Sequence, residues 1–170
     1  VGGTVPRPVA ISDVFAAKGS ISKAALSGYD ALFIGYFNDG SANTFTAAEL
    51  LAMKEWVTDG GSILVSCDNF DHDNVCNAFG YPALATLDIA NPMTPTALGS
   101  AHPAFSGPFG PVASFSGYQT IGFFYSSVGA DVLARDPNGT PVVLEKAYGQ
   151  GKVVFLSDVG GIDYLNYPAK

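Results

Sequence analysis

The sequence predicts an α/β three-layer sandwich with a mainly parallel sheet and an antiparallel hairpin near its C-terminal end. A buried strand, a capped helix, a Gly-Gly pair and a second buried strand follow one another within roughly 40 residues, which is a βαβ unit. Further along, Pro137-Asn138-Gly139 separates two strand-like segments, the pattern of an antiparallel hairpin. The chain has 170 residues and is 48% hydrophobic, enough for one substantial core.

The first two elements have clear boundaries. Residues 29–37, YDALFIGYF, form an apolar run between turn residues and predict a buried strand. In the following FTAAELLAMKEWVTDGG, Thr46 can cap a helix and Glu49, three residues later, completes a capping box. Gly60-Gly61 supplies a left-handed stop to this helix.

The next strand, SILVSC at residues 62–67, follows this helix directly, and such a crossover makes the two strands parallel. A short helix is expected over residues 72–79, closed by Gly80. Residues 81–117 are rich in Pro, Gly and Ser but carry many apolar side chains, so they predict an ordered loop or small strands.

The last third of the chain is predicted to form strands. ADVLARD and TPVVLEKAYG form the predicted hairpin, and KVVFLSD at residues 152–158 is apolar enough to return to the buried sheet. We expect one domain over residues 1–170. VGGTVP at residues 1–6 resembles the end of a strand, and residues 163–170 stop where a closing helix is expected, so a first strand and a last helix are expected outside the chain or from a partner.

Composition narrows the classes of partner. The net charge is -7, and only 14% of residues are charged, so no basic stripe is present to neutralise nucleic-acid phosphates. No apolar run approaches the roughly 18 residues that a membrane-spanning helix needs. Many Ser, Thr, Gly and Asn residues and few Lys are expected at the surface, and this composition favours a secreted or cell-surface protein.

The order of motifs resembles the class I glutamine amidotransferase-like superfamily. The similarity covers roughly residues 29–160 and is carried by YDALFIGYF, FTAAELLAMKEWVTDGGSILVSCDN, AHPAFSG and PVVLEKAYGQGKVVFLSD. More narrowly, it is similar to the non-catalytic branch of exported bacterial proteins and to trehalose-utilisation-type domains. The resemblance implies the flavodoxin-like fold, and it puts Cys67 close to the position of the family's nucleophile.

Cys67 departs from the catalytic pattern of that family. The resemblance calls for Gly-x-Cys-x-Gly, whereas Val65 and Asn69 flank this cysteine, and bulky flanking residues crowd a nucleophile elbow. The family's His-x-Glu partner is missing, because His72 is followed by Asp and Asn. Asp68 opposes formation of a thiolate beside it. The spacing also allows a Cys67–Cys76 disulfide or two buried free thiols, and these alternatives remain open.

Acidic residues are predicted to gather at one edge of the sheet. Asp39, Asp68 and Asp158 each follow a predicted strand, and Asp71 and Asp73 lie in the loop after Cys67. Because the carboxyl ends of parallel strands share one edge, their oxygens could hold calcium. The alternative is that each caps a strand or helix end and is solvated singly.

The aromatic residues Tyr118, Phe123, Phe124 and Tyr125 allow two interpretations, a face that stacks on sugars or binds a partner, and packing in the core. For function we expect a non-catalytic binding or structural module, part of an assembly in a larger exported protein and stabilised by calcium. Its partners would be other protein domains or subunits, or carbohydrate. The rival is a cysteine-dependent hydrolase or amidase using Cys67 with His72 or a carboxylate.

Overall fold

The predicted helix start at Thr46 is present, and it anchors an earlier part of the chain. In the computed structural model, which describes residues 19, 21–35, 45–67, 74–85, 91–107, 110–116 and 122–157, Thr46 and Glu49 form the capping box of helix α2, Ala47–Thr58. The Glu49 carboxylate also accepts the backbone N–H groups of Gly19 and Ile21, at 2.7 and 3.3 Å. The side chain is therefore buried yet fully hydrogen-bonded. Helix α2 ends at Thr58 with Asp59 as its C-cap, and the following Gly60 has a φ of 121°, which favours a residue without a Cβ.

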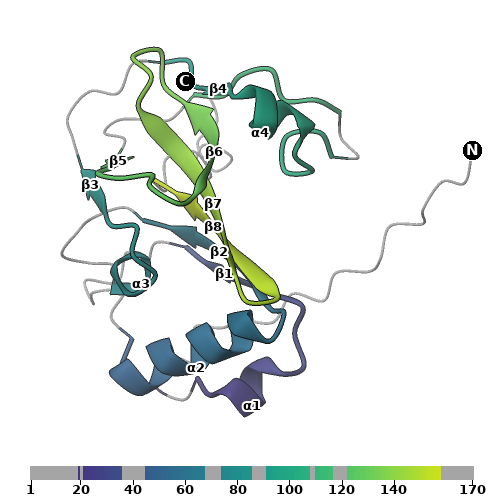
Figure 1. Cartoon of the computed structure of the whole chain (residues 1–170), viewed down its shortest axis with the longest axis vertical. Helices are drawn as coiled ribbons and strands as arrows, with labels where there is room; N and C mark the ends of the chain where they lie inside the picture. The colour runs from purple at the N-terminus through teal and green to yellow at the C-terminus, as the bar shows by residue number, and fades with distance from the viewer. Residues whose placement is uncertain are drawn as a thin grey trace, which may run out of the picture.

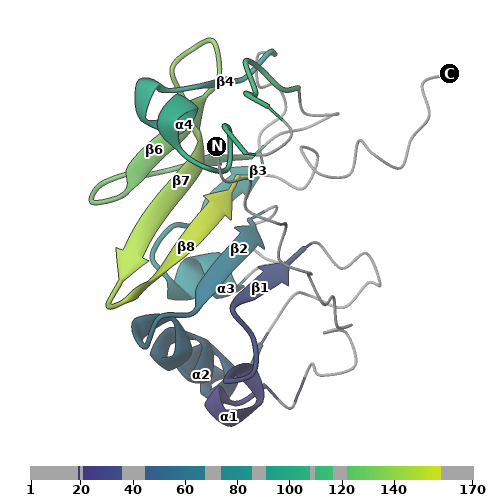
Figure 2. The same ribbon diagram turned by 90° about the vertical axis from the view of Figure 1, so that its right-hand side faces the viewer.

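The main sheet has six strands in the order β1-β2-β8-β7-β6-β4. Strands β1, β2 and β8 are parallel neighbours, and Figure 2 shows them running in the same direction with β7 opposed. Strands β7, β6 and β4 continue the sheet in antiparallel pairs. The remaining strands, β3 and β5, form a separate antiparallel pair. The strand bounds are Ala31–Ile34 for β1, Ser62–Ser66 for β2, Ala83–Ala85 for β3, Thr94–Pro95 for β4, Gly122–Phe124 for β5, Asp131–Arg135 for β6, Pro141–Tyr148 for β7 and Gly151–Leu156 for β8.

Helices pack on both faces of this sheet, so the predicted fold class is confirmed. Helices α1 (Lys23–Leu26), α2 and α3 (Asn74–Ala78) lie together in Figure 1, whereas α4 (Ala97–Ala101) lies near β4 and β6. Successive side chains of β8 point to opposite faces of the sheet. Val153 and Phe155 belong to the larger core on one face, and Val154 and Leu156 pack against the smaller core on the other. The larger core includes Met53, Trp56 and Val57 of α2 and Val75 and Cys76 of α3; the smaller includes Met93, Phe105, Leu133, Ala134, Val142 and Val143.

The predicted hairpin is present, and its turn is built by Asp136. The buried Asp136 carboxylate accepts the backbone N–H of Thr140 at 2.6 Å, and Gly139 adopts a φ of 87°. Helices α1 and α4 are not predicted from the sequence. The segment that contains α4 was expected to be loop or small strands, and it also contains β3 and β4.

Candidate functional site

The carboxyl ends of β1, β2 and β8 meet at one edge of the sheet, as the sequence predicted. Ile34, Ser66 and Leu156 are the last residues of these strands, and Ser66 pairs directly with Leu156. In open α/β sheets this edge is the usual place for ligands. The predicted acidic cluster of Asp39, Asp68, Asp71, Asp73 and Asp158, together with His72, lies outside the described residues.

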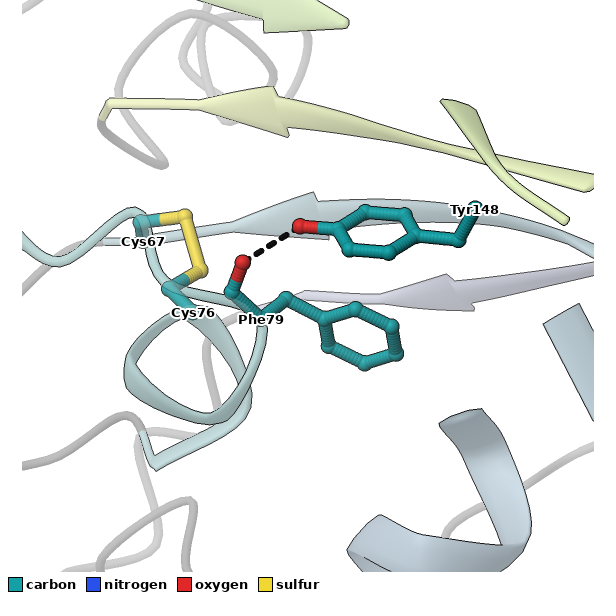
Figure 3. The surroundings of a disulfide bond; sticks show 4 residues. All are labelled: Cys67, Cys76, Phe79 and Tyr148. Carbon is teal, nitrogen blue, oxygen red and sulfur yellow. Dashed lines mark hydrogen bonds between the residues drawn. A yellow bond between two sulfur atoms is a disulfide. The ribbon is translucent and has the colours of Figure 1, made fainter. Parts of the chain in front are cut away.

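Cys67, directly after β2, forms a disulfide with Cys76 of α3 (Figure 3), so the disulfide interpretation is confirmed. The two Cα atoms are 5.9 Å apart, within the normal range for a disulfide. Each cysteine is only 1% exposed. In this state the Cys67 sulfur carries no proton and no negative charge, so it cannot act as a nucleophile.

A tyrosine of β7 ties the same helix to the sheet a second time. The Tyr148 hydroxyl donates a hydrogen bond to the backbone carbonyl of Phe79, just after α3, and the two rings meet edge to face at 5.1 Å. Burial, assisted by nearby Tyr81, raises the pKa of Tyr148 to about 12. The phenol therefore stays protonated and keeps donating throughout the neutral range. Two independent links fix α3 beneath the carboxyl end of β2.

Ser66, the residue before Cys67, has a buried hydroxyl that stands out at this edge. Its side chain lies on the opposite face from the disulfide, because successive residues of a strand alternate. The residue is 1% exposed, and its Oγ has no hydrogen-bond partner among the residues that the structure describes. An unpaired buried hydroxyl is costly, so a water molecule or a bound polar group is expected to satisfy it.

A second polar cluster lies on the face that carries α4. Glu145 of β7 accepts from His102 Nε2 at 3.1 Å and from Lys152 Nζ at 2.9 Å. The backbone N–H of Ala104 donates to His102 Nδ1 at 3.2 Å. Because Nδ1 accepts this bond, the ring proton sits on Nε2 and points at the carboxylate. Both ring nitrogens are engaged, so His102 joins the C-terminal end of α4 to the sheet and has no free nitrogen to act as a base.

The structure divides the aromatic run between core and surface. Phe124 is 3% exposed and packs on Phe155, whereas Tyr125 is 60% exposed and meets Phe123 edge to face at 5.8 Å. The core interpretation therefore holds for Phe124, and Tyr125 is left at the surface. Tyr118 lies outside the described residues.

The described part of the chain contains neither a metal-binding cluster nor a membrane-spanning helix. No three His, Cys, Asp or Glu side chains there come close enough together to hold a metal ion. None of the helices there is long and apolar enough to cross a membrane.

Comparison with known proteins shows the fold. No protein-family model matches the chain, and no curated protein does either. Among solved structures, the cytoplasmic protein STM3548 from Salmonella typhimurium matches with a TM-score of 0.58 and 20% identity, covering 86% of this chain and 69% of that one. A β-galactosidase from Bacillus circulans sp. alkalophilus matches with a TM-score of 0.58 and 16% identity, covering 82% of this chain and 22% of the enzyme.

A putative ThuA-like protein from Bacteroides uniformis also matches, with 14% identity over 84% of this chain and 64% of that one, but its TM-score of 0.49 is too low to support an argument. At these identities the likenesses show the fold alone. They identify no superfamily for this chain. The chain spans about a fifth of the β-galactosidase, at 22% of its length.

Proposed function

We propose that this chain is a non-catalytic binding or structural module of a larger exported protein, and that calcium stabilises it. The Cys67–Cys76 disulfide is the observation that carries this proposal. It occupies the sulfur that the family resemblance places nearest to a nucleophile. Disulfides of this kind persist in oxidising compartments, which favours an exported protein.

The fold comparison supports the module part of the proposal. The same architecture accounts for only 22% of the β-galactosidase, so the fold occurs as one part of a longer chain. A module with this architecture does not need a reaction centre of its own, because fold and activity are separable.

Two observations support calcium at the carboxyl edge. Asp68 and Asp158 each come two residues after the last residue of neighbouring strands, Ser66 and Leu156. The Ser66 hydroxyl at that edge, which has no hydrogen-bond partner within the described part of the chain, is a group that a bound ion or its water would satisfy. Carboxylate and carbonyl oxygens are the ligands that calcium prefers.

The catalytic alternative is tested by the two single cysteine variants, with and without reductant. Cys76→Ser leaves Cys67 as a free thiol, and Cys67→Ser leaves Cys76 as its matched control. Both variants are assayed with amide, ester and glycoside substrates, and we expect no turnover from either. Turnover by Cys76→Ser or reduced wild type that disappears in Cys67→Ser would establish the cysteine-dependent hydrolase and remove the proposal.

Calcium is tested by titration calorimetry and thermal unfolding of the wild type in millimolar calcium or in chelator. We expect heat of binding and a raised unfolding temperature. Both effects should be lost in Asp68→Asn and kept in Asp131→Asn, which alters an exposed carboxylate on β6. Identical melting curves in calcium and chelator would remove calcium from the proposal and leave the module intact.

Carbohydrate is the ligand class that the exposed Tyr125 favours. An exposed tyrosine ring offers a flat apolar face with a polar edge, which suits a sugar ring. Glycan arrays test this by comparing carbohydrate binding of the wild type with that of Tyr125→Ala and of the control Tyr29→Ala. Binding that survives Tyr125→Ala would exclude this ring as the platform.

A further inference from the structure

The tip of the β6–β7 hairpin carries a chemically labile pair of residues, Asn138 and Gly139. Asparagine is one of the thermolabile amino acids, because the backbone nitrogen of the next residue can attack its side-chain amide carbon. A following glycine makes this attack easiest, since it has no side chain to crowd the nitrogen. Of all the asparagines in the sequence, Asn138 alone precedes a glycine. Both residues are exposed, so water reaches the pair.

The closed turn keeps the attacking nitrogen occupied. The Gly139 backbone N–H donates to the Asp136 carbonyl at 3.0 Å, and Gly139 holds a φ of 87°. The Asp136 carboxylate accepts the Thr140 N–H at 2.6 Å. The Arg135 guanidinium donates to the Gly139 carbonyl, also at 2.6 Å. Attack on Cγ of Asn138 requires the nitrogen to leave its hydrogen bond, so only molecules whose turn has opened locally can react.

We propose that Asn138 is a self-modification site, which converts slowly to aspartate and isoaspartate from the opened turn. In the first step the Gly139 nitrogen gives its proton to solvent and bonds to Cγ of Asn138. The Cγ–Nδ2 bond breaks, and ammonia leaves with a proton taken from solvent. The product is a cyclic imide, which water then opens. The sum is one amide and one water giving one carboxylic acid and one ammonia, so no oxidant, reductant or cofactor takes part.

The imide opens at either of its two carbonyl carbons. Breaking the bond between the nitrogen and Cγ gives an ordinary aspartate at position 138. Breaking the bond between the nitrogen and the backbone carbonyl carbon gives isoaspartate instead. In isoaspartate the main chain runs through Cβ and Cγ, so the backbone of the turn becomes one methylene longer.

Neither product fits the closed turn as asparagine does. Nδ2 of Asn138 donates to Oδ2 of Asp136 at 3.4 Å, whereas a carboxylate at the same place has no proton to donate and repels Asp136. The longer backbone of isoaspartate also disturbs the pairing of Arg135 with Pro141 across the hairpin. Behind this turn, β6 and β7 carry residues of the smaller core, namely Leu133, Ala134, Val142 and Val143. Modification at the tip therefore loosens the smaller core from its end.

The modification does not depend on the proposed module function, and mass spectrometry measures it directly. Deamidation adds about 1 Da to the chain, and peptide mapping locates the change and separates aspartate from isoaspartate. The full chain is incubated in mildly alkaline buffer, either folded or unfolded in urea. We expect conversion of Asn138 in both, at least about tenfold slower in the folded chain because its turn is closed. Asn138→Gln should abolish it, because the ring would need one more carbon.

A matched pair of variants tests whether the turn controls the reaction. Asp136→Ala removes the carboxylate that holds the Thr140 N–H, so Asn138 in the folded chain should convert at least about fivefold faster. Asp131→Ala removes an exposed carboxylate at the other end of β6 and should leave the rate unchanged. Arg135→Ala opens the turn without touching the buried carboxylate and should give a smaller acceleration. Circular dichroism establishes that each variant is folded.

The aspartyl product can be made directly as Asn138→Asp. The Gly139 and Thr140 amides of this variant should exchange hydrogen at least about fivefold faster than those of the wild type. Asn138→Ala is the control, because it removes the same hydrogen bond without adding a charge, and it should change the exchange less.

The proposal would be overturned by any of three results. The first is an unmodified Asn138 in the folded chain once the unfolded chain has fully converted. The second is an equal rate of conversion in the wild type and in Asp136→Ala. The third is an equal rate in the folded and unfolded wild type, since the turn would then control nothing. Unchanged amide exchange in Asn138→Asp would remove the effect on the smaller core.

Discussion

The two faces of the sheet are covered unequally. Against one face, α2 and α3 complete a core that runs from β1 through β2 and β8 to β7 and that includes fully buried Val153 and Phe155. On the other face, the smaller core around α4 lies against β6, β7 and β8, while Phe33 and Leu64 of β1 and β2 remain exposed. The comparison teaches that one face stabilises the fold and the other is available for contacts.

The largest expected effect comes from opening the well-covered face. Phe155 is 0% exposed and contacts the rings of Tyr81 and Phe124, so Phe155→Ala should lower the free energy of unfolding by about 3–5 kcal/mol. Phe33→Ala should cost less than about 1 kcal/mol. Urea denaturation at low protein concentration measures both, and equal losses would contradict the inequality of the faces.

The disulfide is the next contributor on the covered face. Replacing both cysteines, as Cys67→Ser/Cys76→Ser, should lower the free energy of unfolding by about 2–3 kcal/mol, because a closed loop of this length restricts the unfolded chain. Wild type unfolded in reductant serves as the control and should lose a similar amount. If the denaturation midpoint were unchanged in both the double variant and the reduced wild type, the Tyr148 contact alone would suffice to hold α3.

On the face of the sheet that carries α4, the stability of the fold should be sensitive to substitution of Gly99. A Cβ at this position would lie 1.9 Å from the Leu133 carbonyl oxygen of β6, so the helix and strand backbones are in direct contact. Gly99→Ala should cost about 1–3 kcal/mol by pushing them apart, although alanine favours helix. Ser100→Ala, on the exposed side of the same helix, should change stability by less than about 0.5 kcal/mol. A stabilised Gly99→Ala protein would show that α4 can shift freely.

The smallest effect should depend on pH. Burial opposes ionisation of Glu49, but hydrogen bonds from Thr46, Gly19 and Ile21 outweigh it and lower the pKa of this carboxyl below its usual 4.5. A lowered folded-state pKa means that the stabilisation is present above about pH 4.5 and is lost as the pH falls through the folded value. Glu49→Gln should therefore cost about 1 kcal/mol at pH 7 and little at pH 3, by thermal unfolding.

Glu55→Gln, on the exposed side of the same helix, is the matched control for removing a negative charge from α2. An equal loss for Glu49→Gln at both pH values would mean that the charge of Glu49 is not what anchors residues 19 to 21.

The sequence predicted best where local chemistry decides the structure. Thr46 and Glu49 form the capping box, and Gly60, Gly80 and Gly139 all have positive φ where a stop or turn was expected. These signals act within four residues and do not depend on the rest of the fold. The βαβ unit followed from them, and so did the parallel edge at the candidate site.

Elements that depend on distant contacts were missed. Helix α4 has no acidic residue in its first turn, and it contains Gly99, a poor helix former. A glycine is needed at this position because the backbone of β6 approaches it closely. Thr96, whose hydroxyl caps α4 by accepting the Gly99 N–H, was the available signal. The Glu145 cluster was missed as well, because its partners His102 and Lys152 come from separate segments. The acidic residues of the candidate site lie outside the described residues, so their convergence remains a prediction.

The position of β8 has a consequence for biosynthesis. This strand comes last in the main sheet by sequence, yet it lies between β2 and β7 and joins the two halves. While the ribosome is still making the chain, β1, α2 and β2 can associate, but the inner edge of β2 has no partner until residues 151–156 emerge. Long-range strand pairing of this kind is slow and leaves apolar edges open to aggregation. We therefore expect truncation before residue 151 to yield an insoluble product.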